Sequence, residues 1–207
     1  MGSLIQKLND YFGSSKEEKE TRKMFVSSTA LKSWWLTVPR NWQQLIADQL
    51  ELDALGEEDV EYVSTLTILE GRRYGLDSLD PVVYLPQLTV LDISENEITD
   101  FGPLGSLSRL RELHLTGCQS IDLGVLTALP QLEILDISYP KAPHRNLEAL
   151  AHLTRLRQLF CNACHLDSLA TVRTLPHLEI LTVPFNPLSR EEVQQFSRTR
   201  PNCRVLF

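Results

Sequence analysis

The sequence predicts an α/β solenoid, a right-handed stack of short units with a curved parallel sheet on its concave face. Similar apolar segments begin at Leu88, Leu110, Leu132, Leu156 and Leu178, at steps of 22, 22, 24 and 22 residues. Within each segment, apolar residues two apart, such as Leu91 and Ile93, indicate a short strand. Between segments, apolar residues three apart, such as Leu123 and Leu126, favour a short 3₁₀ or helical turn. Such units bury their apolar faces only by stacking on one another.

Each unit follows one pattern of leucines. The segments LTVLDISENEI (88–98) and LRQLFCNACHL (156–166) approximate the pattern L-x-x-L-x-L-x-x-N/C-x-L. A degenerate copy, VSTLTILEGRR, begins at Val63, which makes six copies over residues 63–188. The pattern and its period resemble those of leucine-rich repeat proteins. An Asp early in the segment between strands resembles the short-repeat subclass of internalins and phosphatase-regulatory proteins, and this residue is Asp100, Asp122 or Asp167 in three copies. The resemblance implies a bacterial protein that binds other proteins.

The N-terminal region is expected to cap the first repeat. We predict a flexible tail over residues 1–15 and a helical cap over residues 16–62. All three tryptophans, Trp34, Trp35 and Trp42, lie in this cap at near-helical spacing. Burial against the first repeat is the expected arrangement, because large aromatic side chains are mostly buried. An exposed aromatic docking site is the alternative.

The C-terminal residues 189–207 are expected to form a second cap. Ser189 followed by Glu192 predicts a capping box at the start of a helix. Pro201 ends that helix, and the last residues, CRVLF, supply a half-strand. We expect the caps and repeats to form one cooperative domain over residues 16–207.

Composition excludes several classes of partner. The chain has 207 residues and a formal net charge of −7, which disfavours nucleic-acid binding. No run of 18 apolar residues is present, and the N-terminal residues do not resemble a signal peptide. We therefore expect no membrane association and a cytoplasmic location. The four cysteines are expected to be reduced there.

The concave strand face holds the candidate functional residues. Asp92, His114 and Asp136 fall in one column across neighbouring strands, which are about 4.8 Å apart. One interpretation is a metal or acid–base site, since two carboxylates beside an imidazole can hold a cation or orient a base. A second is a partner-binding surface, and the third is a solvated ladder. For partner binding, the predicted residues are Asp92, His114, Asp136, Tyr139, Phe160 and Phe185.

Three further features surround this column. Ser94 and Ser138 fall in a neighbouring column predicted to face outward, without a strained turn that would make them nucleophiles. The 24-residue step places two extra residues in a loop over residues 139–146, which is a plausible contact point. Residues just before the strands alternate in charge and predict a ladder of weak ion pairs; they are Arg111, Glu133, Arg157 and Glu179.

The segment from Cys161 to His165 matches C-x-x-C-H, the spacing that attaches c-type haem. The repeat register offers a simpler explanation. Cys161 falls at a core strand position, and Cys164 falls in the Asn/Cys column of the repeat, as does Cys118. We therefore predict no haem, no metal and no other cofactor.

The preferred function is a non-catalytic module that binds a protein partner on the concave strand face. The alternative is a regulatory subunit or scaffold of an enzyme such as a phosphatase. A metal-dependent or hydrolytic enzyme built on Asp92, His114 and Asp136 is less favoured, because an open sheet offers no pocket that excludes water.

Overall fold

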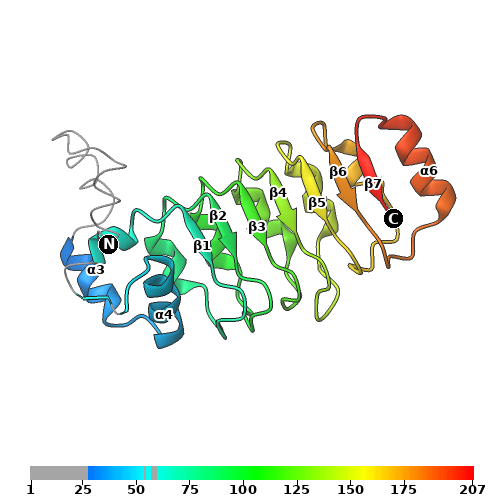
Figure 1. Cartoon of the computed structure of the whole chain (residues 1–207). Helices are drawn as coiled ribbons and strands as arrows, with labels where there is room; N and C mark the ends of the chain where they lie inside the picture. The colour runs from blue at the N-terminus through cyan, green and yellow to red at the C-terminus, as the bar shows by residue number, and fades with distance from the viewer. Residues whose placement is uncertain (1–27, 54, 57–59) are drawn as a thin grey trace, which may run out of the picture.

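The structure is a computed structural model that describes residues 28–53, 55–56 and 60–207 (Figure 1). The predicted tail, residues 1–15, and the first part of the predicted cap, residues 16–27, lie outside the described residues. No helix within the described ranges is long and apolar enough to cross a membrane.

Seven short parallel strands form a single sheet, in which the order in space equals the order in sequence. Figure 1 shows them as one row of arrows with the helical turns behind it. The strands are β1 (Ile68–Glu70), β2 (Val90–Asp92), β3 (Glu112–His114), β4 (Ile134–Asp136), β5 (Gln158–Phe160), β6 (Ile180–Thr182) and β7 (Arg204–Leu206). The predicted solenoid with one parallel sheet is confirmed, and the predicted last half-strand is β7.

The strand register aligns the central leucines of the repeats. Leu91 pairs with Leu69 in β1 and with Leu113 in β3. The first repeat therefore begins at Leu66, and the alignment that started it at Val63 is wrong by three residues. Val63 instead ends the short helix α5 (Val60–Val63). With this correction, the first step is also 22 residues, from Leu66 to Leu88.

The face opposite the strands consists of 3₁₀ helices, as the three-residue spacing predicted. They are η1 (Asp80–Tyr84), η2 (Gly102–Ser106), η3 (Leu123–Ala128), η4 (Leu147–His152) and η5 (Val172–Thr174). Their inward leucines, such as Leu104 and Leu126, are fully buried and join the strand leucines in one continuous core. Adjacent 3₁₀ helices stack on one another, so each repeat completes the core of its neighbour.

The described part of the N-terminal cap consists of α3 (Ser28–Trp35), α4 (Arg40–Gln49) and α5. Trp34, Trp35 and Trp42 are buried, so the alternative of an exposed aromatic docking site is wrong. Trp34 stacks on Tyr84 of η1 at 4.6 Å between ring centroids. The Trp42 indole N–H donates to the Ser78 carbonyl at 2.9 Å. These contacts attach the cap to the first repeat.

The C-terminal cap is α6 (Arg190–Thr199) followed by β7. The Ser189 hydroxyl accepts the Glu192 backbone N–H at 3.1 Å, as the capping box predicted. In a capping box, the side chain at the Glu192 position also accepts the backbone N–H of the cap residue. The Glu192 carboxylate accepts the Leu169 N–H at 2.7 Å and the Ser168 hydroxyl at 3.2 Å instead. Glu192 therefore attaches α6 to the preceding repeat.

A ladder of side chains fills the turns that follow the strands. The Asn96 amide donates to the Ile93 carbonyl at 2.9 Å and accepts the Leu76 N–H at 2.9 Å. Asn186 makes the equivalent bonds near the C-terminal end. The thiols of Cys118 and Cys164 occupy the same column and donate to backbone carbonyls. Buried backbone groups of successive repeats are satisfied in this way.

His144 replaces the ladder side chain in the fourth repeat, where Pro140 occupies the Asn column and has no donor. The His144 Nδ1 accepts the Ile121 N–H at 3.2 Å, and Nε2 donates to the Ile137 carbonyl at 2.9 Å. The Ile137 carbonyl corresponds to the Ile93 carbonyl that Asn96 serves, and the Ile121 N–H lies one position after the equivalent of the Leu76 N–H. The two additional residues of this repeat give the loop enough length to turn His144 inward, where it is buried.

Candidate functional site

Two rows of side chains project from the strands on the side opposite the core. Row A contains Ile68, Val90, Glu112, Ile134, Gln158, Ile180 and Arg204. Row B contains Glu70, Asp92, His114, Asp136, Phe160, Thr182 and Leu206. The predicted residues Asp92, His114, Asp136 and Phe160 are therefore neighbours in row B. Glu70 and Leu206 belong to the same row; the misaligned first repeat concealed Glu70.

The polar groups of row B are held by local hydrogen bonds. The Asp92 Oδ1 accepts the Ser94 N–H at 2.8 Å, and the Asp136 Oδ1 accepts the Ser138 N–H at 2.9 Å. The His114 Nε2 lies 2.7 Å from a Glu112 carboxylate oxygen in row A. Although His114 lies between two aspartates in register, its bonded partner is Glu112. Within the described ranges, no group of three or more His, Cys, Asp or Glu residues is placed to hold a metal ion.

Ser94 and Ser138 do not face outward as predicted. Both are buried, because the chain turns inward immediately after β2 and β4. The Ser94 hydroxyl accepts the Thr116 N–H, and the Ser138 hydroxyl accepts the Asn162 N–H, each at 3.1 Å. These hydroxyls connect successive turns and are inaccessible to a substrate.

The turn after each of the first six strands has a left-handed backbone conformation at the same position of the repeat. This left-handed column contains Arg73, Glu95, Gly117, Tyr139, Ala163 and Phe185, with φ between 54° and 70°. Aromatic residues are disfavoured at positive φ, where Gly and Asn are the usual occupants. Tyr139 and Phe185 are nevertheless aromatic, and 48% and 78% of their surfaces are exposed. Both were predicted site residues, and they project at the edge of the sheet beside β4 and β6.

The small residues of the left-handed column leave gaps between the large ones. A depression of about 590 Å³ lies over Gly117 and is lined by Arg72, Glu95, Thr116, Gly117, Tyr139 and Lys141. Arg72 and Arg73 pair with Glu95, and hydrogen bonds from these two guanidinium groups lower the pKa of the Glu95 carboxyl. Lys141 pairs with Glu97. Lys141 is therefore balanced by Glu97, whereas Arg72 and Arg73 share one carboxylate and leave a single positive charge beside the depression.

A second row of paired charges lies just before the strands, as the alternating column predicted. Arg157 forms a two-oxygen pair with Glu179, at 2.8 and 3.0 Å. Arg111 lies 3.6 Å from Glu133. Since these cations are already paired, they do not balance the carboxylates of rows A and B.

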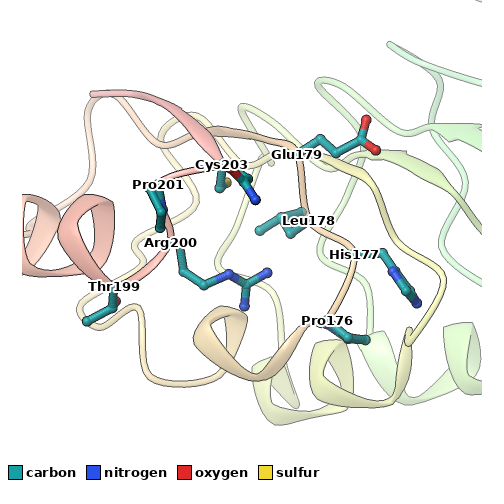
Figure 2. Close-up of a pocket in the computed structure, with 9 residues that line it drawn as sticks. Pro176, His177, Leu178, Glu179, Thr199, Arg200, Pro201 and Cys203 are labelled. Atoms are coloured by element: carbon teal, nitrogen blue, oxygen red, sulfur yellow. The ribbon is translucent and has the colours of Figure 1, made fainter.

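A depression at the junction of the last repeat and the C-terminal cap has a structural explanation (Figure 2). Arg200, Cys203 and Leu178 are among its lining residues, and its volume is about 330 Å³. The Arg200 guanidinium donates to the carbonyls of Arg173 and Leu175, which attaches the cap to η5. Figure 2 shows the Glu179 side chain directed away from Arg200. The arrangement lacks a nucleophile paired with a base.

The cysteines of the C-x-x-C-H segment are part of the core. Cys118, Cys161, Cys164 and Cys203 are all free and buried. Burial raises the pKa of the Cys164 thiol to about 12 and that of Cys161 well above its usual value. Both thiols are therefore protonated at neutral pH and behave as small apolar groups.

Comparison with known families and structures agrees with this architecture. The family profile described as "Leucine Rich repeats (2 copies)" matches residues 86–128. A leucine-rich repeat protein of Leptospira interrogans matches over 75% of this chain and 40% of its own, with a TM-score of 0.61 and 25% identity. The internalin inlF of Listeria monocytogenes matches over 80% of this chain and 48% of its own, with a TM-score of 0.65 and 23% identity.

A further structural match is the functional domain of InlJ from Listeria monocytogenes, which includes a cysteine ladder. It covers 75% of this chain and 38% of that protein, with a TM-score of 0.52 and 20% identity. The present chain spans less than half the length of each of these three structures. No curated protein sequence matches the chain.

Proposed function

We propose that this chain, which is a leucine-rich repeat protein, acts as a non-catalytic module that binds a protein partner on its strand face. One observation carries the proposal. Tyr139 and Phe185 expose aromatic rings from a backbone conformation in which aromatic residues are disfavoured. Because six successive repeats share this conformation, the unusual feature is the exposed aromatic side chain at two of them. Exposed aromatic side chains are also typical anchors of protein interfaces.

The surroundings of the candidate polar residues support binding over catalysis. Asp92 and Asp136 bond to backbone N–H groups, and His114 bonds to Glu112. None of these three side chains is paired with a nucleophile within the described ranges, and the face is open to solvent. General acid–base catalysis requires a group poised against a reacting atom, usually in a site that excludes water. A binding surface has no such requirement.

A regulatory subunit or enzyme scaffold would use the same face. This alternative, with a phosphatase as the enzyme, rests on the resemblance to phosphatase-regulatory repeat proteins alone. The identity of the captured partner distinguishes it from a simple adaptor.

We also propose a cytoplasmic location, which is supported by the four free thiols.

The test is affinity capture from an extract of the native cell with the full chain as bait. The variant Asp92→Asn/Asp136→Asn/Phe160→Thr alters row B, and Asn keeps the oxygen that accepts the backbone N–H. We expect this variant to lose the specific partner, because both charge and apolar area are removed from the face. The control Asp77→Asn/Glu148→Gln/Val83→Thr makes comparable changes at exposed residues outside rows A and B. Retention of every partner by the row B variant would disprove binding at this face.

A further inference from the structure

The strand face has two chemically different halves. The four carboxylates of rows A and B, Glu70, Asp92, Glu112 and Asp136, all lie on β1–β4. Arg204 on β7 is the one Lys or Arg residue in the two rows. These four carboxylates outweigh the one positive charge that remains where Arg72 and Arg73 share Glu95. The other cations nearby are paired one to one with Glu97, Glu133 and Glu179, so the face over β1–β4 has an excess of negative charge.

Beyond β4, neither row contains a carboxylate, and Phe160 is the one aromatic side chain in the two rows. Ile134, Phe160 and Ile180 project from β4, β5 and β6 and are partly exposed. Tyr139 and Phe185 stand at the adjoining edge, two repeats apart, with the small residue Ala163 between them. Two strand spacings correspond to about 10 Å, enough to admit one side chain between the rings. This half offers aromatic and aliphatic contacts over β4–β6.

An unpaired polar group marks the half of the face beyond β4. Thr182 belongs to row B, yet it is only 6% exposed. Its hydroxyl makes no hydrogen bond. Its two neighbours in register, Phe160 and Leu206, have apolar side chains that offer none. A buried hydroxyl without a partner is destabilising. A ligand that displaces the neighbouring exposed side chains can supply that partner.

We propose that the strand face binds an extended segment of a partner protein, basic where it crosses β1–β4 and apolar or aromatic where it crosses β4–β6. The inference rests on the proposed function and adds the chemistry of the partner. The five strand spacings from β1 to β6 span about 24 Å, which about seven residues of extended chain can cross. Lys or Arg side chains at one end meet the carboxylates, and aromatic or aliphatic side chains at the other contact Phe160 and the two edge rings.

The test is selection from a library of random 12-residue peptides displayed on phage, against the immobilised full chain. We expect the enriched peptides to carry Lys or Arg at one end and Trp, Phe or Leu at the other. Synthetic copies should bind at least tenfold more tightly than versions in which either end is replaced by Gly and Ser. Their affinity should also fall as salt rises, because exposed charge pairs are screened.

Two variants assign each end of the peptide to its half of the face. Glu70→Gln/Asp92→Asn/Asp136→Asn should weaken binding at least tenfold and reduce its salt dependence. Asp77→Asn/Glu148→Gln/Glu191→Gln removes the same charge outside rows A and B and should leave binding unchanged. Tyr139→Asn/Phe185→Asn should weaken binding without changing the salt dependence, and Asn tolerates the left-handed backbone. Circular dichroism of each variant verifies the fold.

The outcomes separate this inference from the proposed function. Enriched peptides that lack the basic end but still depend on Tyr139 and Phe185 would overturn the inference and leave protein binding intact. Enrichment of acidic peptides, or of none, would overturn it as well. Loss of the native partner from the row B variant in affinity capture would then still support protein binding at this face.

Discussion

His144 shows how one side chain can preserve the repeat where its sequence pattern fails. Its imidazole accepts the Ile121 N–H and donates to the Ile137 carbonyl, so it is neutral with its proton on Nε2. Burial lowers the pKa of His144, and the bond to the Ile137 carbonyl opposes this effect. Protonation places a second N–H against the Ile121 N–H and breaks that bond.

This arrangement predicts a pH-dependent stability. Because the folded-state pKa of His144 is lowered, stability is complete above the unfolded value of about 6.5 and decreases as the pH falls below it. Urea denaturation at pH 7.5, 6.5 and 5.5 should show this decrease. Carboxyls whose pKa is lowered, such as that of Glu95, change the stability only at pH values below this range. His144→Gln should remove the slope between pH 7.5 and 5.5; an unchanged slope would contradict the assignment to His144.

The core role of Cys161 and Cys164 could be predicted from the sequence because it depends only on the repeat register. The role of His144 could not. Its partners, Ile121 and Ile137, lie 23 and 7 residues away in the sequence. Only the path of the loop brings them together. The same limit applies to His114, whose bond to Glu112 depends on side-chain rotamers rather than on the column.

At the scale of elements, Glu192 connects α6 to the preceding repeat through the Leu169 N–H. Glu192→Ala should lower the free energy of unfolding by about 1–3 kcal/mol, because it leaves that N–H without a partner. Glu191→Ala is the matched control, since Glu191 is exposed and also lies in the first turn of α6. Equal losses in the two variants, measured by urea denaturation, would show that charge at the helix start is responsible instead.

The strands, the 3₁₀ turns and both caps were predictable because each has its own apolar spacing. The start of the first repeat was not. Val63 and Leu66 are both buried and apolar, and each can begin the leucine pattern. Strand pairing of Leu69 with Leu91 decides between them. Gly117 in the left-handed column could have indicated a positive φ. The aromatic residues Tyr139 and Phe185 gave no such indication, so the rest of the column could not be predicted.

At the scale of the whole molecule, each repeat contacts mainly its neighbours, while the core runs without interruption from the N-terminal cap to β7. We predict that the caps and repeats unfold together. All three tryptophans lie in the N-terminal cap, so their fluorescence reports on that cap and its contact with the first repeat. Far-UV circular dichroism reports on the complete chain. The two urea transitions should coincide; a fluorescence change at lower urea would identify the cap as a separate unit.

The left-handed column has a consequence for how such a surface can diversify. In its first five members, the backbone N–H bonds to a carbonyl of the following repeat, at 2.8 to 3.1 Å. Because the backbone makes these bonds, the side chain can vary without loss of the connection. Duplication of one repeat would add one such variable position, about 4.8 Å along the sheet. The side chains that contact a partner can thus change one position at a time, while the leucine core stays constant.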